Sequence, residues 1–334
     1  MDNNNNPRYR SLFWPILLVG VGIVWLLSNL GLVQPISLGS ILKFWPVVLI
    51  VFGLDMLFSR RYPWVGAVVG LLAVAGVVAL LMFGPQVGIT TNSETKSETF
   101  TAPLQGVKTV EYNFDTSSSP VDIYALDNNM NDLISADITY RGTMRFDVNG
   151  TDHTTVSMSE YSDNSSWLTW DFSQLNNLKW DIGLSPEIPS DIVLNGGSGS
   201  ITMDLTGIQL TSLRTDTGSG SSNITLPESK DPYTVDVQSG SGSVTLRVPE
   251  QASLTLSLDT GSGSTSVVIP AKAAVRIEVN DDGSGSFDLP NGLMKAPDSS
   301  SFDIGAWQTP NYDTADNKIL IQILGQGSGS ISIR

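Results

Sequence analysis

The string Gly-Ser-Gly-Ser occurs six times in this 334-residue chain at nearly fixed intervals. The strings begin at Gly197, Gly218, Gly240, Gly261, Gly283 and Gly327, so successive starts lie 21, 22, 21, 22 and 44 residues apart. A flexible Gly/Ser linker has no reason to keep a period, whereas self-similarity at about 20–50 residues is typical of repeat architectures. The last interval equals two periods, so one copy is missing near Gly305.

Apolar residues alternate with polar residues on both sides of the strings. Around the string at Gly240, the alternating apolar residues are Tyr233, Val235 and Val237 before it and Val244, Leu246 and Val248 after it. A period of two is typical of a half-buried β-strand. Each unit is therefore predicted to be a strand, a corner and a second strand. The glycines permit backbone angles that other residues resist, and the small serines let corners stack closely.

Strand parity alone leaves two topologies open. An antiparallel meander and a stack of parallel coils would both place the same residues on one face. Near-identical units favour stacked coils, a β-solenoid, because like residues then lie over like residues. The predicted inner ladder, six residues after each first glycine, is Met203, Ile224, Leu246, Val267 and Leu289.

A degenerate copy around Ser117 extends the repeat region back to about Val110. Between Leu126 and Ile188 the pattern is interrupted by longer excursions. Strands are still predicted there at 133–140, 144–148, 167–172 and 178–184, and Asn149-Gly150 predicts a hairpin turn.

The first 84 residues contain three apolar runs, at about 12–33, 41–58 and 64–83. A membrane-spanning helix needs about 20 apolar residues. The sequence therefore predicts a tail at 1–10, a three-helix transmembrane module at 11–84, a linker at 85–109 and a β-solenoid-like domain at 110–334. The fold class is membrane α followed by all-β.

Basic residues predict the orientation of the membrane module. Arg8 and Arg10 precede the first run, Arg60 and Arg61 lie between the second and third, and Lys43 marks the opposite side. The positive-inside rule places the basic loops in the cytoplasm. Residues 85–334 are then predicted to lie outside the cytoplasmic membrane, in the periplasm or outside the cell.

Composition excludes several function classes. The chain has no cysteine, one histidine (His153) and a net charge of −15. Residues 85–334 hold 13 basic and 31 acidic residues, so their net charge of −18 disfavours binding to nucleic acid. The lipid bilayer is the expected partner of the first 84 residues.

No grouping of side chains predicts catalysis, cofactor binding or a metal site, and the chain is predicted not to be an enzyme. Outward aspartates on the predicted strands have the spacing of a solvated face: Asp204, Asp216, Asp236, Asp259 and Asp288. Asp281-Asp282 is interpreted as a solvated turn, and Trp167, Trp170 and Trp180 as core or end-cap residues in preference to a sugar-stacking site.

Two stretches carry a family resemblance. "SLFWPILLVGVGIVWLLSNLGL" with "FWPVVLIVFGLDMLFSRR" resembles the transmembrane module of LiaF-type bacterial membrane proteins. "WDIGLSPEIPSDIVLNGGSGSITMDLTGIQLTSLRTDTGSGSSNITLP" resembles their toast-rack β domain and related adhesin-like domains. The resemblance implies a membrane part that restrains a sensor kinase and reports on cell-envelope stress. The alternative is a surface-anchored structural or adhesive β-repeat module.

Overall fold

The computed structural model describes residues 95–128, 131–161, 178–281 and 283–334, together with residues 18, 19, 22, 68, 72 and 75. The latter six are helical and fall within the first and third predicted spans. The remainder of the predicted membrane module lies outside the described residues. Within the described part of the chain, no helix is long and apolar enough to span a membrane. The chain divides into two units, and the β domain belongs to the second, residues 94–163 and 177–334.

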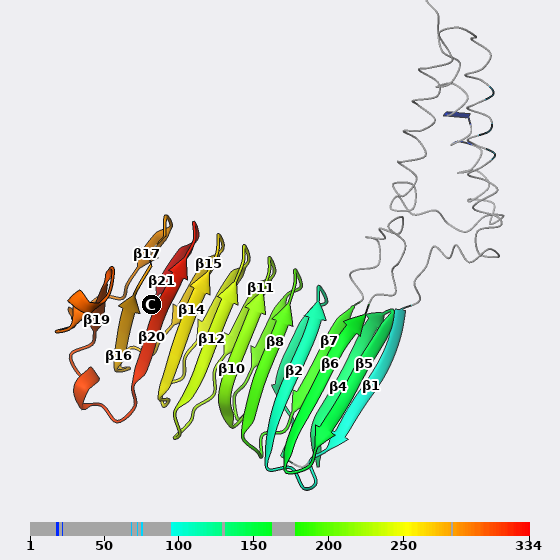
Figure 1. The fold of residues 1–334 in the computed structure, drawn as a ribbon, viewed down its shortest axis with the longest axis horizontal. Helices are drawn as coiled ribbons and strands as arrows, with labels where there is room; N and C mark the ends of the chain where they lie inside the picture. Colours follow the sequence, from blue (N-terminus) through cyan, green and yellow to red (C-terminus); the bar gives the residue numbers. More distant parts are fainter. Residues whose placement is uncertain are drawn as a thin grey trace, which may run out of the picture. The chain divides into compact units, whose positions relative to one another are not determined.

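The β domain consists of two large sheets whose inner faces enclose one hydrophobic core (Figure 1). In spatial order, the 10-stranded sheet contains β1 (Thr95–Pro103), β4 (Asp132–Arg141), β7 (Lys179–Leu184), β3 (Val121–Ala125), β9 (Ile201–Asp204), β11 (Ser221–Thr225), β13 (Ser243–Arg247), β15 (Ser264–Val268), β21 (Ser330–Ile333) and β17 (Ser286–Asp288). The 11-stranded sheet contains β18 (Met294–Lys295), β19 (Gly305–Gln308), β16 (Val275–Val279), β20 (Ile319–Gln326), β14 (Leu254–Thr260), β12 (Tyr233–Ser239), β10 (Leu210–Thr217), β8 (Ser190–Gly196), β2 (Thr109–Ser117), β6 (His153–Tyr161) and β5 (Thr143–Gly150).

Each repeat is one coil that crosses from the 11-stranded sheet to the 10-stranded sheet through a Gly-Ser corner. β12 leads into β13, for example, and both strands pair in parallel with the equivalent strands of neighbouring coils. The prediction of stacked parallel coils is therefore confirmed for the repeats, and the antiparallel meander is excluded. The degenerate copy at Ser117 is also a coil, formed by β2 and β3.

The last coil of the chain does not lie at the end of the stack. β20 pairs with β14 on one side and with β16 on the other, and β21 likewise lies between β15 and β17. The corner at Gly327 is therefore inserted between those at Gly261 and Gly283. The copy missing near Gly305 is replaced by an end structure: residues 289–318, all of them described, contain β18, β19, η3 (Ser299–Ser301) and η4 (Tyr312–Thr314) and no further coil of the repeat.

This insertion also corrects the predicted inner ladder. Met203, Ile224, Leu246 and Val267 are consecutive neighbours and are almost fully buried. The next residue is Ile333 of β21, which pairs with Val267. Leu289 was wrongly predicted to follow Val267, since the inserted coil separates them.

At the N-terminal end of the stack, too, a coil lies between strands that are not its neighbours in the sequence. The coil β2–β3 lies between β8–β9 and the strands β6 and β7. β4, β5 and β7 confirm three of the predicted strands, whereas β6 was not predicted and the predicted strand at 167–172 lies outside the described residues. The β5–β6 hairpin is present, but its connection is Thr151-Asp152, and Gly150 ends β5 with a φ of 103°.

The predicted linker at 85–109 contains a strand. β1 occupies Thr95–Pro103 and pairs antiparallel with β4 over its whole length. The β domain therefore includes Thr95–Pro103, which the sequence analysis assigned to the linker. The strand escaped prediction because two of its four inward positions are charged, at Lys96 and Glu98.

Candidate functional site: a serine-lined groove

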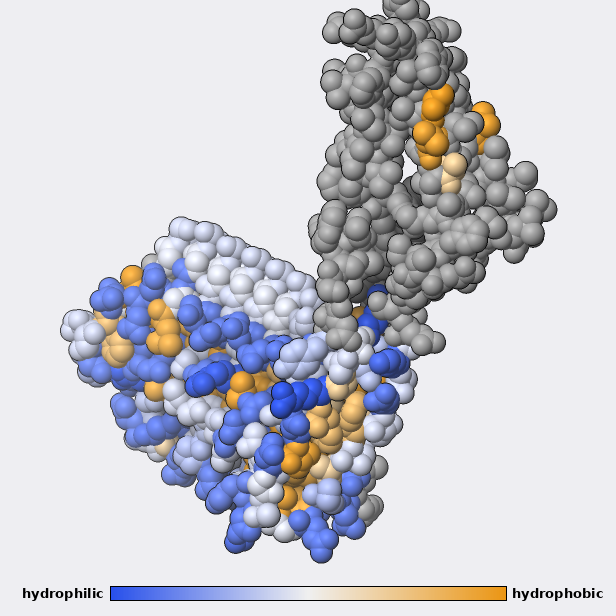
Figure 2. All heavy atoms as spheres, turned by 45° about the vertical axis from the view of Figure 1, so that its right-hand side comes forward, coloured by the Kyte–Doolittle hydropathy of each residue, from blue (hydrophilic) through white to orange (hydrophobic). Residues whose placement is uncertain are grey.

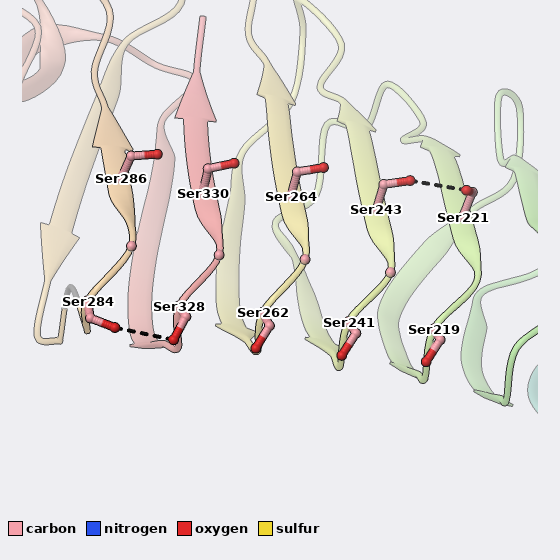
Figure 3. Close-up of a pocket in the computed structure, with 14 residues that line it drawn as sticks. Ser219, Ser221, Ser241, Ser243, Ser262, Ser264, Ser284, Ser286, Ser328 and Ser330 are labelled. Atoms are coloured by element: carbon pink, nitrogen blue, oxygen red, sulfur yellow. Dashed lines mark hydrogen bonds between the residues drawn. The ribbon is translucent and has the colours of Figure 1, made fainter.

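The Gly-Ser corners line a shallow groove along one edge of the stack (Figure 3). Five corners contribute, in the spatial order 219–221, 241–243, 262–264, 328–330 and 284–286. Each corner connects the end of a strand in the 11-stranded sheet to the start of a strand in the 10-stranded sheet. The groove therefore runs across the strands and is built from five separate repeats.

Hydrogen bonds between backbones hold each corner directly on the next. Ser243 N donates to Gly220 O at 3.2 Å, Ser264 N donates to Gly242 O at 3.2 Å, and Ser330 N donates to Gly263 O at 3.0 Å. The second glycine of each corner has no room for a side chain. A Cβ on Gly263 would lie 1.7 Å from Gly242 O, far inside van der Waals contact. The sequence requires glycine here because one backbone lies against another.

The serines form two parallel rows of hydroxyl groups. The first row is Ser219, Ser241, Ser262, Ser328 and Ser284, and the second is Ser221, Ser243, Ser264, Ser330 and Ser286. Neighbours within a row are separated by about 4.8 Å, the spacing of paired strands. Ser243 Oγ donates to Ser221 Oγ at 3.1 Å, and the Oγ atoms of Ser284 and Ser328 are 3.2 Å apart.

The groove can form hydrogen bonds, but its lining supplies no group for acid–base chemistry. Every residue that lines it is serine or glycine. A serine hydroxyl becomes a nucleophile only beside a general base, and no lining side chain can act as one. In the described part of the chain, no three His, Cys, Asp or Glu side chains are grouped so as to hold a metal ion.

The outward aspartates named from the sequence are distributed over both sheets and form no site. Asp236 makes a loose ion pair with Arg214, with the two charged atoms 3.6 Å apart. Asp204 Oδ1 accepts a hydrogen bond from Thr206 N. Asp259 and Asp288 are exposed and lie in different sheets. Their interpretation as a solvated face agrees with these positions.

The other residues considered from the sequence have structural roles where they are described. Trp180 is fully buried in the core. Trp167, Trp170 and Asp282 lie outside the described residues. Asp281 Oδ1 accepts a hydrogen bond from Gly283 N at 2.9 Å, which shapes the turn before the corner. His153 Nδ1 lies 2.6 Å from Thr109 Oγ1 on an exposed strand start.

A charged cluster around Arg276 of β16, on the coil that ends in the corner at Gly283, is structural. Arg276 Nη2 donates to both carboxylate oxygens of Asp298, at 2.9 and 2.8 Å, and Arg276 Nε donates to Glu278 Oε1 at 2.8 Å. The hydrogen bonds from Arg276 lower the pKa of Asp298. Glu278 Oε2 accepts from Gln322 Nε2 as well. These bonds fasten the loop after β18 to the 11-stranded sheet and leave no carboxylate free for chemistry.

Sequence reasoning identified the corners but not the groove. The Gly-Ser strings were interpreted as a packing device, and nothing in their pattern singled out the hydroxyl rows. One feature of the sequence could have indicated the groove. Serine follows each glycine in all six strings, although close stacking of the corners requires only the glycines.

Comparisons with known proteins agree with the two-part organisation. The LiaF transmembrane domain matches residues 13–97, and the N-terminal domain of toast_rack matches residues 90–247. No curated protein matches the chain. A solved structure of a candidate cell adhesion protein from Clostridium sporogenes is 19% identical, with a TM-score of 0.47, and the match covers 72% of this chain and 99% of that one. For a candidate adhesin from Bacteroides fragilis the identity is 11% and the TM-score 0.26, over the same shares.

Both solved structures are too distant to carry an argument about function. Neither matching family is an enzyme family. The two family matches follow one another along the chain and together cover residues 13–247. The chain therefore carries a LiaF transmembrane domain match followed by a toast-rack domain match, and the two together support a membrane-associated protein of the cell envelope that is similar to LiaF-type proteins.

Proposed function

We propose that this protein is a non-enzymatic accessory regulator of envelope-stress sensing, which acts on a membrane sensor kinase. The observation that carries the proposal is the joining of a LiaF transmembrane domain to a rigid β stack whose groove offers only hydroxyl and backbone groups. Such a surface can hold a partner or an envelope component but cannot turn over a substrate. The kinase contact is assigned to the membrane helices, as the resemblance to LiaF-type proteins implies.

The kinase proposal predicts a stable membrane complex. Affinity purification of the tagged full-length protein, after crosslinking in native membranes, should enrich a histidine kinase. Doubly substituted protein, Ser241→Gln with Ser262→Gln, is the matched control. Both serines are exposed in the groove, so glutamine there obstructs the groove without entering the core. Kinase recovery should be the same for both proteins. Absence of any kinase from both preparations would refute the proposal.

A second candidate function is an adhesive or structural module that binds wall polymers. The regular hydroxyl rows favour it, because hydroxyl groups can donate and accept hydrogen bonds with sugar hydroxyls. The same double variant separates the two functions. An adhesive module should lose binding to purified wall polymer when the groove is obstructed, and a helix-mediated regulator should not change.

The orientation of the β domain is also part of the proposal. The basic residues at 8, 10, 60 and 61 predict that residues 85–334 lie outside the cytoplasmic membrane. Alkaline phosphatase, which is active only outside, should be active when fused after Asn92 and inactive when fused after Tyr62. Activity at Tyr62 without activity at Asn92 would reverse the orientation and place the groove in the cytoplasm.

A further inference from the structure

The two ends of the β stack are built differently. Beyond the coil β2–β3, the 10-stranded sheet continues through β7, β4 and β1, whereas the 11-stranded sheet continues only through β6 and β5. The connection between β4 and β5, at Gly142, crosses from one sheet to the other. β1 is therefore one strand further out than β5, and no described strand lies opposite it. This end of the stack has the shape of a step.

The inner surface of the step is partly apolar, and no described strand covers it. Phe100 of β1 and Phe146 of β5 meet across the gap, with ring centroids 5.4 Å apart, and both are only half-buried. Val148 of β5 is 42% exposed although it faces inward. Figure 2 turns this end forward and shows hydrophobic surface on it. At the other end, by contrast, the chain's own residues 289–318 form an end structure, in which Trp307 packs on Phe287.

We propose that a second copy of this chain covers the step, with each β1 added to the partner's 11-stranded sheet beside β5. A step of one strand is complementary to itself when a twofold axis runs parallel to the strands between the two sheets. Rotation then places β1 of each copy in the empty position opposite the other β1. The same patch is used by both copies, as in an isologous interface. Phe100 and Phe146 of both copies then form one buried cluster.

Strand directions support this axis. β1 is antiparallel to β4, and β4 is antiparallel to β7, so β1 runs in the same direction as β7. The chain reverses direction at the corner between β2 and β3, and β3 is parallel to β7, so β2 runs against β7. β5 runs against β6, which is parallel to β2, and therefore runs in the same direction as β7. Rotation about an axis parallel to the strands preserves direction, so β1 and the partner's β5 lie parallel. It also leaves both Thr95 ends on the same side of the pair. Two chains anchored in one membrane need this arrangement, and a twofold axis across the strands would place these ends on opposite sides.

The inward charges of β1 also fit this partner. Lys96 and Glu98 are two residues apart on the same face, about 6–7 Å along the strand. Within one chain Lys96 Nζ donates to Gly142 O at 3.0 Å. Across the twofold axis the proposed partner would add a second contact, between Lys96 of each copy and Glu98 of the other. Inward charges on an edge strand otherwise serve to prevent pairing. If the charges have that role, the outer edge of β1 stays unpaired. The crosslinking experiment below distinguishes an unpaired β1 from a β1 paired with the partner's β5.

The absence of cysteine from the chain allows a clean crosslinking test in the full-length protein in membranes. The double variant Thr101→Cys with Asp147→Cys places one thiol on each outer face, beside the residues Phe100 and Phe146, whose rings are in contact. Within one chain the two thiols are separated by two sheets, about 10 Å apart, which is beyond the reach of a disulfide. Between copies they become neighbours, so oxidation should convert most of the protein to a covalent dimer. Thr99→Cys with Arg145→Cys, two residues along, should do the same.

The controls decide between geometries. Each single variant should remain a monomer on a non-reducing gel, because identical positions lie on opposite outer faces of the pair. Thr245→Cys with Asp236→Cys, in the middle of the two sheets, should also remain a monomer. Covalent dimers from Thr99→Cys or Thr101→Cys alone would indicate antiparallel β1–β1 pairing and overturn the proposed axis. If both double variants remained monomers, β1 would be an edge strand whose inward charges prevent pairing, and the proposed dimer would be wrong.

Discussion

Substituting Gly242 by alanine is expected to destabilise the β domain by about 3 kcal/mol, an effect typical of a side chain forced into a packed site. A Cβ at this position would lie 1.9 Å from Gly220 O and 3.0 Å from Gly220 C. The corner would have to move away from its neighbour, which would disrupt the hydrogen bonds from Ser243 N to Gly220 O and from Ser264 N to Gly242 O. For a domain of this size, the melting temperature should fall by roughly 6–12 °C. Thermal unfolding of the purified protein, followed by the β-sheet circular dichroism signal, measures the change.

Two matched variants isolate the cause. Gly207 has a φ of +87° and open space around its Cβ position, so Gly207→Ala introduces backbone strain without a collision and should cost only about 1 kcal/mol. Ser241→Ala removes one exposed hydroxyl and should leave the melting temperature nearly unchanged. If Gly242→Ala melted together with Ser241→Ala, the corners would not be in contact and the stacking would be wrong.

The Gly242 case also shows where sequence reasoning gave the right conclusion for a partly wrong reason. The glycines of the corners were expected to hold angles that other residues resist. Among the corner glycines of the repeats, only Gly283 has a φ in the left-handed region, at 52°. The others are required because a neighbouring carbonyl oxygen occupies the space of a Cβ. A pattern of recurring glycines cannot distinguish these reasons, since contact between coils is a property of the assembled stack.

The parts of the fold that could be predicted are those in which one strand carries its own signal. β12, β13 and β14 bury an apolar residue at every second position, so their inward face is evident from the sequence. β1 and β6 were missed because their inward faces are diluted by polar groups. β6 buries Thr154 beside Val156 and Met158, and β1 has charges where the opposite sheet is absent.

The spatial order of the coils could not be predicted for a different reason. Period and parity are identical whether the last coil follows β16–β17 or is inserted before it. One local mark of the insertion is an extra residue in β20, where Leu324 is left out of the pairing with β14 and is 50% exposed. The order of the serines along the groove could not be predicted for the same reason. Ser328 and Ser330 become neighbours of Ser262 and Ser264 only because the last coil is inserted.

Replacing Leu246 by aspartate is expected to have the largest effect, a loss of at least about 4 kcal/mol or failure to fold. Leu246 is fully buried and is paired with Ile224 on one side and Val267 on the other, so a carboxylate there finds no partner and no water. Burial would raise the pKa of the new carboxyl above its unfolded value. The unfolded state then binds fewer protons, so the penalty should grow as pH rises above about 4 and shrink below it. Thr245→Asp, one residue earlier on the outer face of the same strand, is the matched control and should change stability by less than about 1 kcal/mol at any pH. Unfolding of both variants at pH 4 and pH 7 tests the assignment of faces: similar melting temperatures for the two would mean that Leu246 does not belong to a buried ladder.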